Sequence, residues 1–109
     1  MTTTYKVLGQ AATDGTTTAN LYTVPSATQT VVSTISICNT RTANASVNVM
    51  VIPSGETIST SSYILSNPAI TYYDTLILTL GLTLNAGDTV QCSSNLANVS
   101  FNLFGSEIS

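Results

Sequence analysis

Charged side chains are the scarcest feature of this sequence. They make up 6% of its 109 residues, where about 25% is usual for a soluble domain, and only Lys6 and Arg41 are cations. Nucleic-acid binding normally needs Lys and Arg against several phosphates, so two cations exclude that class of partner. Thr, Ser and Asn replace the missing charges, with 20, 14 and 9 residues. A surface this neutral resists self-association poorly, so we expect it either to be solubilised by hydroxyls and amides or to be covered by neighbours in an assembly.

Histidine and tryptophan are absent, and there are two cysteines. Without histidine, neither a Ser-His-Asp nor a Cys-His catalytic device can be built, and two cysteines are too few for a structural zinc site. Two alternatives remain, a carboxylate pair of the glycosidase type and a calcium site built from Asp14, Asp74 and Asp88. We nevertheless predict a non-enzymatic protein with no catalytic, metal or cofactor site. The carboxylates are scattered, mostly in turn-like sequence: Asp14, Glu56, Asp74, Asp88 and Glu107.

Long apolar runs are also missing, and we expect no leader sequence. No run approaches the roughly 18 residues that a membrane-spanning helix needs, and residues 1–6 contain no apolar segment of the signal-peptide type. We therefore expect no membrane partner, and we expect Cys38 and Cys92 to be reduced thiols. At this length the sequence predicts a single domain over residues 1–109.

Apolar and polar residues alternate with a period of two along most of the chain, which predicts strands. Four shorter runs, at 31–37, 47–51, 90–92 and 99–103, have the same pattern, with Val31, Ile35 and Ile37 expected on one core-facing side. The clearest run covers 75–84, where Gly81 marks a bulge or a bend that splits the run into two strands. Alternation there places five leucines on the core face and mostly threonines outside: Leu76, Leu78, Leu80, Leu82 and Leu84.

Turn residues separate these runs. Asp14-Gly15 is a strong turn dipeptide, and further turn signals occur at 53–56, 67–68, 85–88 and 95–98. Short strands at regular spacing, divided by such turns, are typical of sandwiches and barrels. The sequence predicts an all-β fold, an antiparallel β-sandwich of about eight strands that is jelly-roll-like.

Four side chains are candidates for contact with a partner. Tyr72 and Tyr73 are adjacent, and neighbouring residues in a strand point to opposite faces, so we expect one of them to be exposed. Tyrosine is favoured at interfaces because it is large, stiff and half polar. Lys6 and Arg41 are the two cations, and Arg41 lies in turn-like sequence. The competing interpretation is that the tyrosines close the ends of the core and that Arg41 is a solvated loop tip.

Three segments resemble phrases of a known family. They are residues 21–39 (LYTVPSATQTVVSTISICN), 84–90 (LNAGDTV) and 99–108 (VSFNLFGSEI). They resemble small β-sandwich virion structural proteins of tailed phages, especially phages of cyanobacteria, and the likeness covers most of the chain after residue 18. It implies a virion component of the head, neck or tail and transfers no functional residues. The last segment also resembles the end of trimeric jelly rolls of the complement and tumour-necrosis-factor type, which implies a trimer.

From this resemblance and the neutral surface we expect a structural protein of a phage particle, made in the host cytoplasm and located in the virion. The favoured role is a capsid decoration or cement protein on the outer head surface that stabilises the shell. Its partners would be the major capsid protein or other virion proteins, and further copies in a homotrimer. The alternatives are a tail, neck or fibre component, and a carbohydrate-binding module that uses Tyr72 or Tyr73 on a host surface.

Overall fold

The computed structural model describes residues 2–109, apart from the side chain of Leu80. These residues form mostly strands, as the abundant β-branched residues favour. Over this range no helix is long and apolar enough to cross a bilayer. The elements in chain order are β1 (Thr3–Asp14), β2 (Ala19–Thr23), β3 (Gln29–Asn39), β4 (Ala45–Ile52), the 3₁₀ turn η1 (Thr60–Ser62), β5 (Tyr63–Ile70), β6 (Thr75–Leu84), β7 (Thr89–Ser94) and β8 (Ala97–Ile108).

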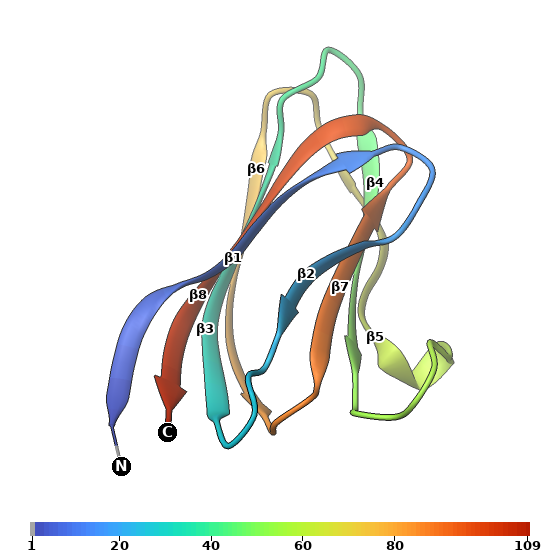
Figure 1. Ribbon diagram of the computed structural model, residues 1–109. Helices are drawn as coiled ribbons and strands as arrows, with labels where there is room; N and C mark the ends of the chain where they lie inside the picture. The colour runs from blue at the N-terminus through green and yellow to red at the C-terminus, as the bar shows by residue number, and fades with distance from the viewer. Residues whose placement is uncertain (1) are drawn as a thin grey trace.

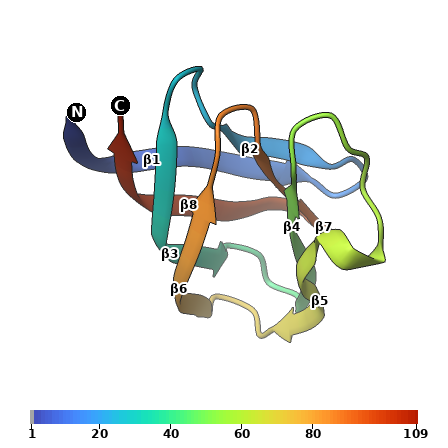
Figure 2. The same ribbon diagram turned by 90° about the horizontal axis from the view of Figure 1, so that it is seen from below.

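Within the described residues the eight strands form two four-stranded antiparallel sheets that lie face to face (Figures 1 and 2). Sheet A has the order β1-β8-β3-β6, and sheet B has the order β2-β7-β4-β5. Strands from opposite ends of the chain are therefore neighbours, as in a jelly roll, where two Greek keys build a pair of sheets. The predicted all-β, jelly-roll-like sandwich is confirmed.

Alternating side chains from both sheets meet between them as the hydrophobic core. Each buried side chain of this kind stabilises the fold by roughly 1.5–3 kcal/mol relative to an exposed one. Cys92 lies in this core as a free thiol whose pKa is raised to about 12 by burial, while Cys38, also free, is half-buried. The inward faces predicted for β4, β7 and β8 are confirmed by side chains with no exposed surface: Val47, Val49, Val90, Cys92, Val99, Phe101 and Leu103.

Strand β3 departs from the predicted alternation at Ser33. Val32 pairs with Gly105 of β8 and Thr34 pairs with Phe104, so Ser33 is an extra residue opposite β8. A bulge of this kind exchanges the two faces of a strand. Ile35 and Ile37 are fully buried as predicted, but before the bulge Val32, not Val31, faces the core. The prediction for Val31 was therefore wrong.

Strand β6 is an edge strand, and this limits how deeply its leucines are buried. Leu84 is buried, whereas Leu76, Leu78 and Leu82 are half-buried on the same side. The side chain of Leu80 lies outside the described residues. Gly81 lies where the register with β3 shifts, as predicted, but β6 continues through the shift as one strand, so the predicted split is wrong.

The connections alternate between the two ends of the sandwich (Figure 1). The β3–β4 and β5–β6 loops lie at one end, and the β2–β3, β4–β5 and β6–β7 connections lie at the other. Both chain ends are at this second end, where Thr2 and Ser109 exchange two backbone hydrogen bonds of 2.6 and 2.9 Å. Residues far apart in the sequence therefore meet at each end.

Candidate functional site

The loops β3–β4 (residues 40–44) and β5–β6 (residues 71–74) lie side by side, and together we call them the tyrosine end. A fully buried residue, Asn39, joins them. Its side-chain amide donates to the carbonyl oxygens of Ala43 at 2.9 Å and Ile70 at 3.0 Å, and its Oδ1 accepts from the Arg41 backbone N–H at 3.0 Å. Its own backbone N–H donates to the Asp74 carbonyl at 2.9 Å. One side chain thus fixes both loops.

Tyr72 and Tyr73 both project from this end, with 56% and 68% of their surfaces exposed. Only one was expected to be exposed, because the sequence predicted a strand, but the pair lies in the β5–β6 loop. Their rings form an edge-to-face pair with centroids 6.3 Å apart and planes at 84°. The Tyr72 backbone N–H donates to Asn44 Oδ1 at 3.2 Å.

The backbone of Tyr73 is in the left-handed region, with φ +57°. For a bulky residue this conformation is an outlier that costs of order 1–3 kcal/mol and persists only when its surroundings hold it. Here the surroundings include the hydrogen bond from the Asp74 N–H to the Thr71 carbonyl at 3.0 Å and the Asn39 contacts. The loop backbone that presents the two exposed tyrosines is therefore held in place.

Arg41 is exposed in the β3–β4 loop and belongs to the tyrosine end through its backbone contact with Asn39. Sequence reasoning selected Arg41, Tyr72 and Tyr73 separately, and the fold brings their loops together. Asn39, which organises them, was not selected. Asn is common in turns because its side chain bonds nearby backbone, and only that weak signal could have pointed to it.

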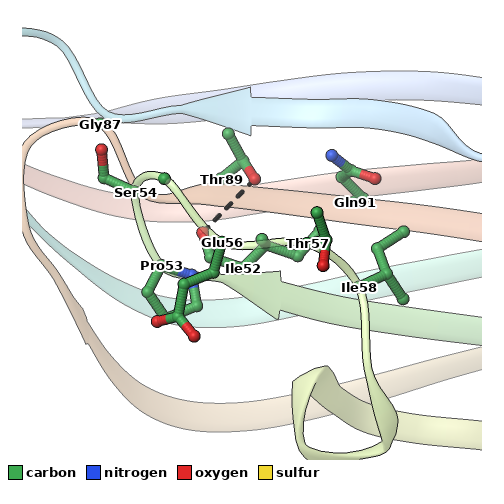
Figure 3. A pocket seen from close by; sticks show the side chains of 10 residues that line it. Ile52, Pro53, Ser54, Glu56, Thr57, Ile58, Gly87, Thr89 and Gln91 are labelled. Carbon is green, nitrogen blue, oxygen red and sulfur yellow. Dashed lines mark hydrogen bonds between the residues drawn. The ribbon is translucent and has the colours of Figure 1, made fainter.

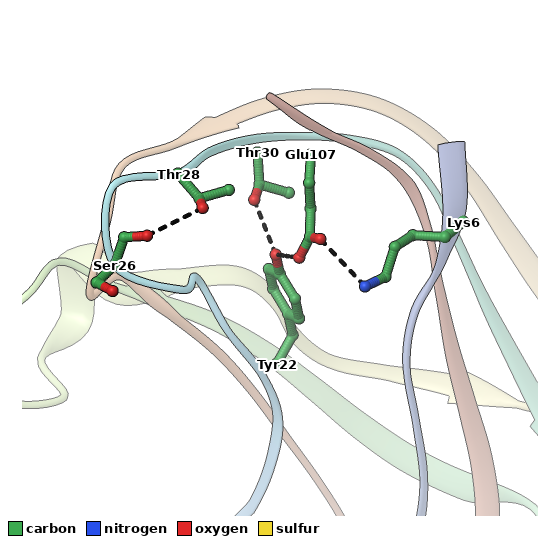
Figure 4. Close-up of polar contacts among 6 residues, drawn as sticks. All are labelled: Lys6, Tyr22, Ser26, Thr28, Thr30 and Glu107. Atoms are coloured by element: carbon green, nitrogen blue, oxygen red, sulfur yellow. Dashed lines mark hydrogen bonds and ion pairs between the residues drawn. The ribbon is translucent and has the colours of Figure 1, made fainter. Parts of the chain in front are cut away.

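Lys6, the fourth candidate, lies at the opposite end of the sandwich in a polar cluster that joins the two sheets (Figure 4). Its Nζ is 3.1 Å from Glu107 Oε1. The Tyr22 hydroxyl, from sheet B, donates to Glu107 Oε2 and lies 2.8 Å from Thr30 Oγ1 of sheet A. We call these four residues the polar clasp.

The polar clasp lowers the pKa of Glu107 and raises the pKa of Tyr22. The hydrogen bond from Tyr22, and after it the Lys6 ammonium, hold the pKa of Glu107 below its ordinary value against the effect of burial. Burial, reinforced by the neighbouring carboxylate, raises the pKa of Tyr22 to about 12. The cluster therefore favours an ionised Glu107 beside a neutral Tyr22. Lys6 is part of this internal arrangement, and its role as a partner contact stays a prediction.

Over the rows that pair with Tyr5, Val7 and Gln10 of β1, the exposed side of sheet A, which we call the outer face, carries uncharged side chains. The exposed carboxylate of Asp14 lies beyond these rows, at the end of β1. Lys6 and Glu107 alternate with its residues and point to the other side, into the clasp. A shallow pocket of about 380 Å³ beside β1, β3 and β8 is lined in part by Tyr5, Val31 and Phe104, and Lys6 also borders it. Register places these residues on the outer face: Tyr5, Val7 and Gln10; Ser106, Phe104 and Asn102; Val31, Thr34 and Ser36; Thr83, Thr79 and Ile77.

The sequence did not predict that the residues of the outer face form one continuous surface. Its residues come from four strands spread over the whole chain, so only the sheet order shows that they are neighbours. The signal that could have found it is the second parity of each alternating run, which contains Thr, Ser, Asn and Gln in place of charges.

A pocket of about 350 Å³ lies outside sheet B, where residues 53–58 fold back over β4 and β7 (Figure 3). Ile52, Thr89 and Gln91 line it from the strands, and Glu56 and Ile58 line it from the loop. Thr89 Oγ1 donates to the Ile52 carbonyl at 3.5 Å. The lining of this pocket presents hydroxyl, amide and carboxylate groups, beside apolar surface, to a ligand. Within the described part of the chain, no group of three or more His, Cys, Asp or Glu residues is placed to hold a metal ion.

Comparisons with known proteins give a likeness of fold. No protein-family model and no curated protein matches the sequence. A chain of the T13 viral particle of infectious bursal disease virus is similar with a TM-score of 0.57 and 10% identity, over 97% of this chain and 29% of that one. Chains from the Gt and Gx strains of that virus have TM-scores of 0.48 and 0.47 and identities of 10% and 7%, each over 97% of this chain and 32% of theirs. This chain spans less than a third of the virus chains, and it shares its sandwich fold with part of a virus-particle protein.

Proposed function

We propose that this chain is a non-enzymatic structural protein of a virion that works packed against other subunits. The observation that carries the proposal is the jelly-roll strand order combined with an exposed sheet face on which the rows paired with Tyr5, Val7 and Gln10 bear no formal charge. A neutral face rich in Thr, Ser and Asn can be covered by a neighbour without stranding a buried charge, whose desolvation is costly. The fold likeness to a chain of a viral particle supports the same role.

Within that role we propose a capsid decoration or cement protein on the outer head surface of a phage. The sequence resemblance to small phage virion proteins supports this location. Subunits, as trimers, would bridge neighbouring copies of the major capsid protein, and many weak contacts would act together through multivalency. Resistance to the internal pressure of packaged DNA would follow from the bridging.

The test compares particles assembled with and without this chain. We expect particles that lack it to release DNA at a lower temperature and to rupture more readily after osmotic shock, and adding the purified chain back should restore both. Equal survival of the two kinds of particle would overturn the cement role.

Quantitative mass spectrometry of the same particles then separates the locations. A high copy number per particle, comparable with that of the major capsid protein, supports decoration. A low copy number per particle indicates the neck, tail or fibre role.

A second candidate function is carbohydrate binding, and the exposed tyrosine pair favours it. Aromatic faces pack on the apolar faces of sugars, and a loop backbone that is already held in place loses little entropy on binding. We expect Tyr73→Ala to abolish any signal of the chain on a glycan array, while Tyr5→Ala, which removes an exposed tyrosine 84% accessible on β1, leaves the signal unchanged. An array without signal for the unchanged chain excludes this function.

A further inference from the structure

The described sheets end in four edge strands, and three of them carry features that discourage pairing with another strand. Charges, prolines, short length and bulges all have this effect. Strand β1 contains Lys6 and two register shifts. Strand β2 has five residues and one shift. Strand β5 contains Pro68 and two shifts.

The fourth edge strand, β6, has ten residues, and its one register shift comes after residues 75–79. It contains no charge and no proline, and it pairs with β3 without a register shift from Thr34 to Cys38. Within the described residues no strand pairs with its other side. At the centre of residues 75–79, Ile77 is 62% exposed. A regular, uncharged edge with free backbone N–H and C=O groups is a template for another strand.

The sequence of this edge favours a second copy of the chain as the partner. Residues 75–79 read Thr-Leu-Ile-Leu-Thr, the same in both directions about Ile77. If two copies pair antiparallel about a twofold axis at Ile77, Ile77 meets its own equivalent, Leu76 meets Leu78, and Thr75 meets Thr79. In a twofold contact residue i of one copy meets residue j of the other and j meets i, and here the palindrome places isoleucine on isoleucine, leucine on leucine and threonine on threonine.

We propose that β6 pairs with β6 of a second copy, so that the two A sheets join into one continuous eight-stranded sheet. The new strand pair satisfies the free backbone groups of both edges and covers Ile77. With no charge on the edge, the two copies meet without the like-charge repulsion that opposes such pairs. A strand of an unrelated protein could use the same backbone groups, but a second copy brings the matching Thr-Leu-Ile-Leu-Thr segment with it. The contact is independent of the virion role, although it would link neighbouring subunits in a shell.

The oligomeric state of the purified chain tests the proposal. By sedimentation equilibrium we expect the wild type to contain an even number of 11.3 kDa chains and Ile77→Lys to halve that number, because two ammonium groups would face each other across the axis. Thr18→Lys is the control. It places the same charge at an exposed position between β1 and β2, outside both the β6 edge and the outer face, and should leave the mass unchanged. A wild type that stays a single chain, or an equal loss in both variants, overturns the proposal.

Cross-linking tests the register even if Ile77→Lys does not fold. Directly opposite residues in an antiparallel pair have Cα atoms about 4.5–5.5 Å apart, within the range that a disulfide spans. With Cys38→Ser in the background, Ile77→Cys should form a covalent dimer on mild oxidation, and Val7→Cys should not. Failure of Ile77→Cys to cross-link, or equal cross-linking of the two variants, contradicts the twofold pairing at Ile77.

Discussion

At the scale of single residues, buried polar groups make the hydrogen bonds that hold loops and strands together at both ends of the sandwich. Asn39 has no exposed surface, yet its side chain makes hydrogen bonds to the backbone of both loops at the tyrosine end. At the other end Tyr22 reaches from sheet B to Glu107 and Thr30 of sheet A. In the described part of the chain no buried side-chain nitrogen or oxygen lacks a partner. Because an unpaired buried polar group costs about 1–3 kcal/mol, each of these contacts constrains its surroundings strongly.

Glu107 gives a pH-dependent prediction. Its pKa in the folded chain lies below the ordinary value of 4.5, so its contribution to stability is complete above about pH 4.5 and is lost as the pH falls through the folded pKa. We expect Glu107→Gln to lower the free energy of unfolding by about 1.5 kcal/mol at neutral pH, the low end for hydrogen bonds to charged groups.

Below pH 4.5 the stabilities of the wild type and Glu107→Gln should converge, as measured by thermal unfolding at a series of pH values. Glu56→Gln, in the exposed loop after β4, is the control and should show no such convergence. A constant difference between wild type and Glu107→Gln at every pH would refute the role of the ionised carboxylate.

At the scale of elements, the strands could be predicted from the sequence, but their irregularities could not. Period-two alternation is a local property, and it located β4, β6, β7 and β8 and the faces they bury. The bulge at Ser33 arises from the fit of β3 to β8, a strand more than sixty residues away in the sequence. The prediction for Val31 failed for this reason, because the bulge exchanges the two faces of β3. Tyr72 and Tyr73 were likewise expected in a strand, but the left-handed backbone at Tyr73 places them in a loop.

The two glycines near this irregularity should respond differently to substitution. A Cβ on Gly105 would lie 2.1 Å from the Val31 carbonyl oxygen, whereas a Cβ on Gly81 would meet nothing within 4 Å. Backbone must move to accommodate the first change, so we expect Gly105→Ala to destabilise the chain by about 2–4 kcal/mol. Gly81→Ala should stay within about 1 kcal/mol of the wild type. Urea unfolding measures both, and equal effects would show that β8 is not packed so closely on β3.

At the scale of the whole molecule, the fold class followed from the sequence and the surface did not. Alternation and turn dipeptides were enough for an antiparallel sandwich of about eight strands. Which strands are neighbours depends on long-range pairing, and so does the gathering of exposed residues into faces. The four candidate contacts therefore divide between the two ends, with Arg41, Tyr72 and Tyr73 at one and Lys6 at the other. The scarcity of charge was visible from the start, but only the sheet order places the resulting neutral surface on one side of sheet A.

The pairing of Thr2 with Ser109 has a practical consequence for engineering. Both chain ends emerge side by side, opposite the tyrosine end, on a molecule whose longest dimension is 45 Å. A fluorescent protein or an antigen fused to either end would leave from the same place and point away from Tyr72 and Tyr73. The chain could therefore carry cargo on one side while the tyrosine end stays free to engage whatever it binds.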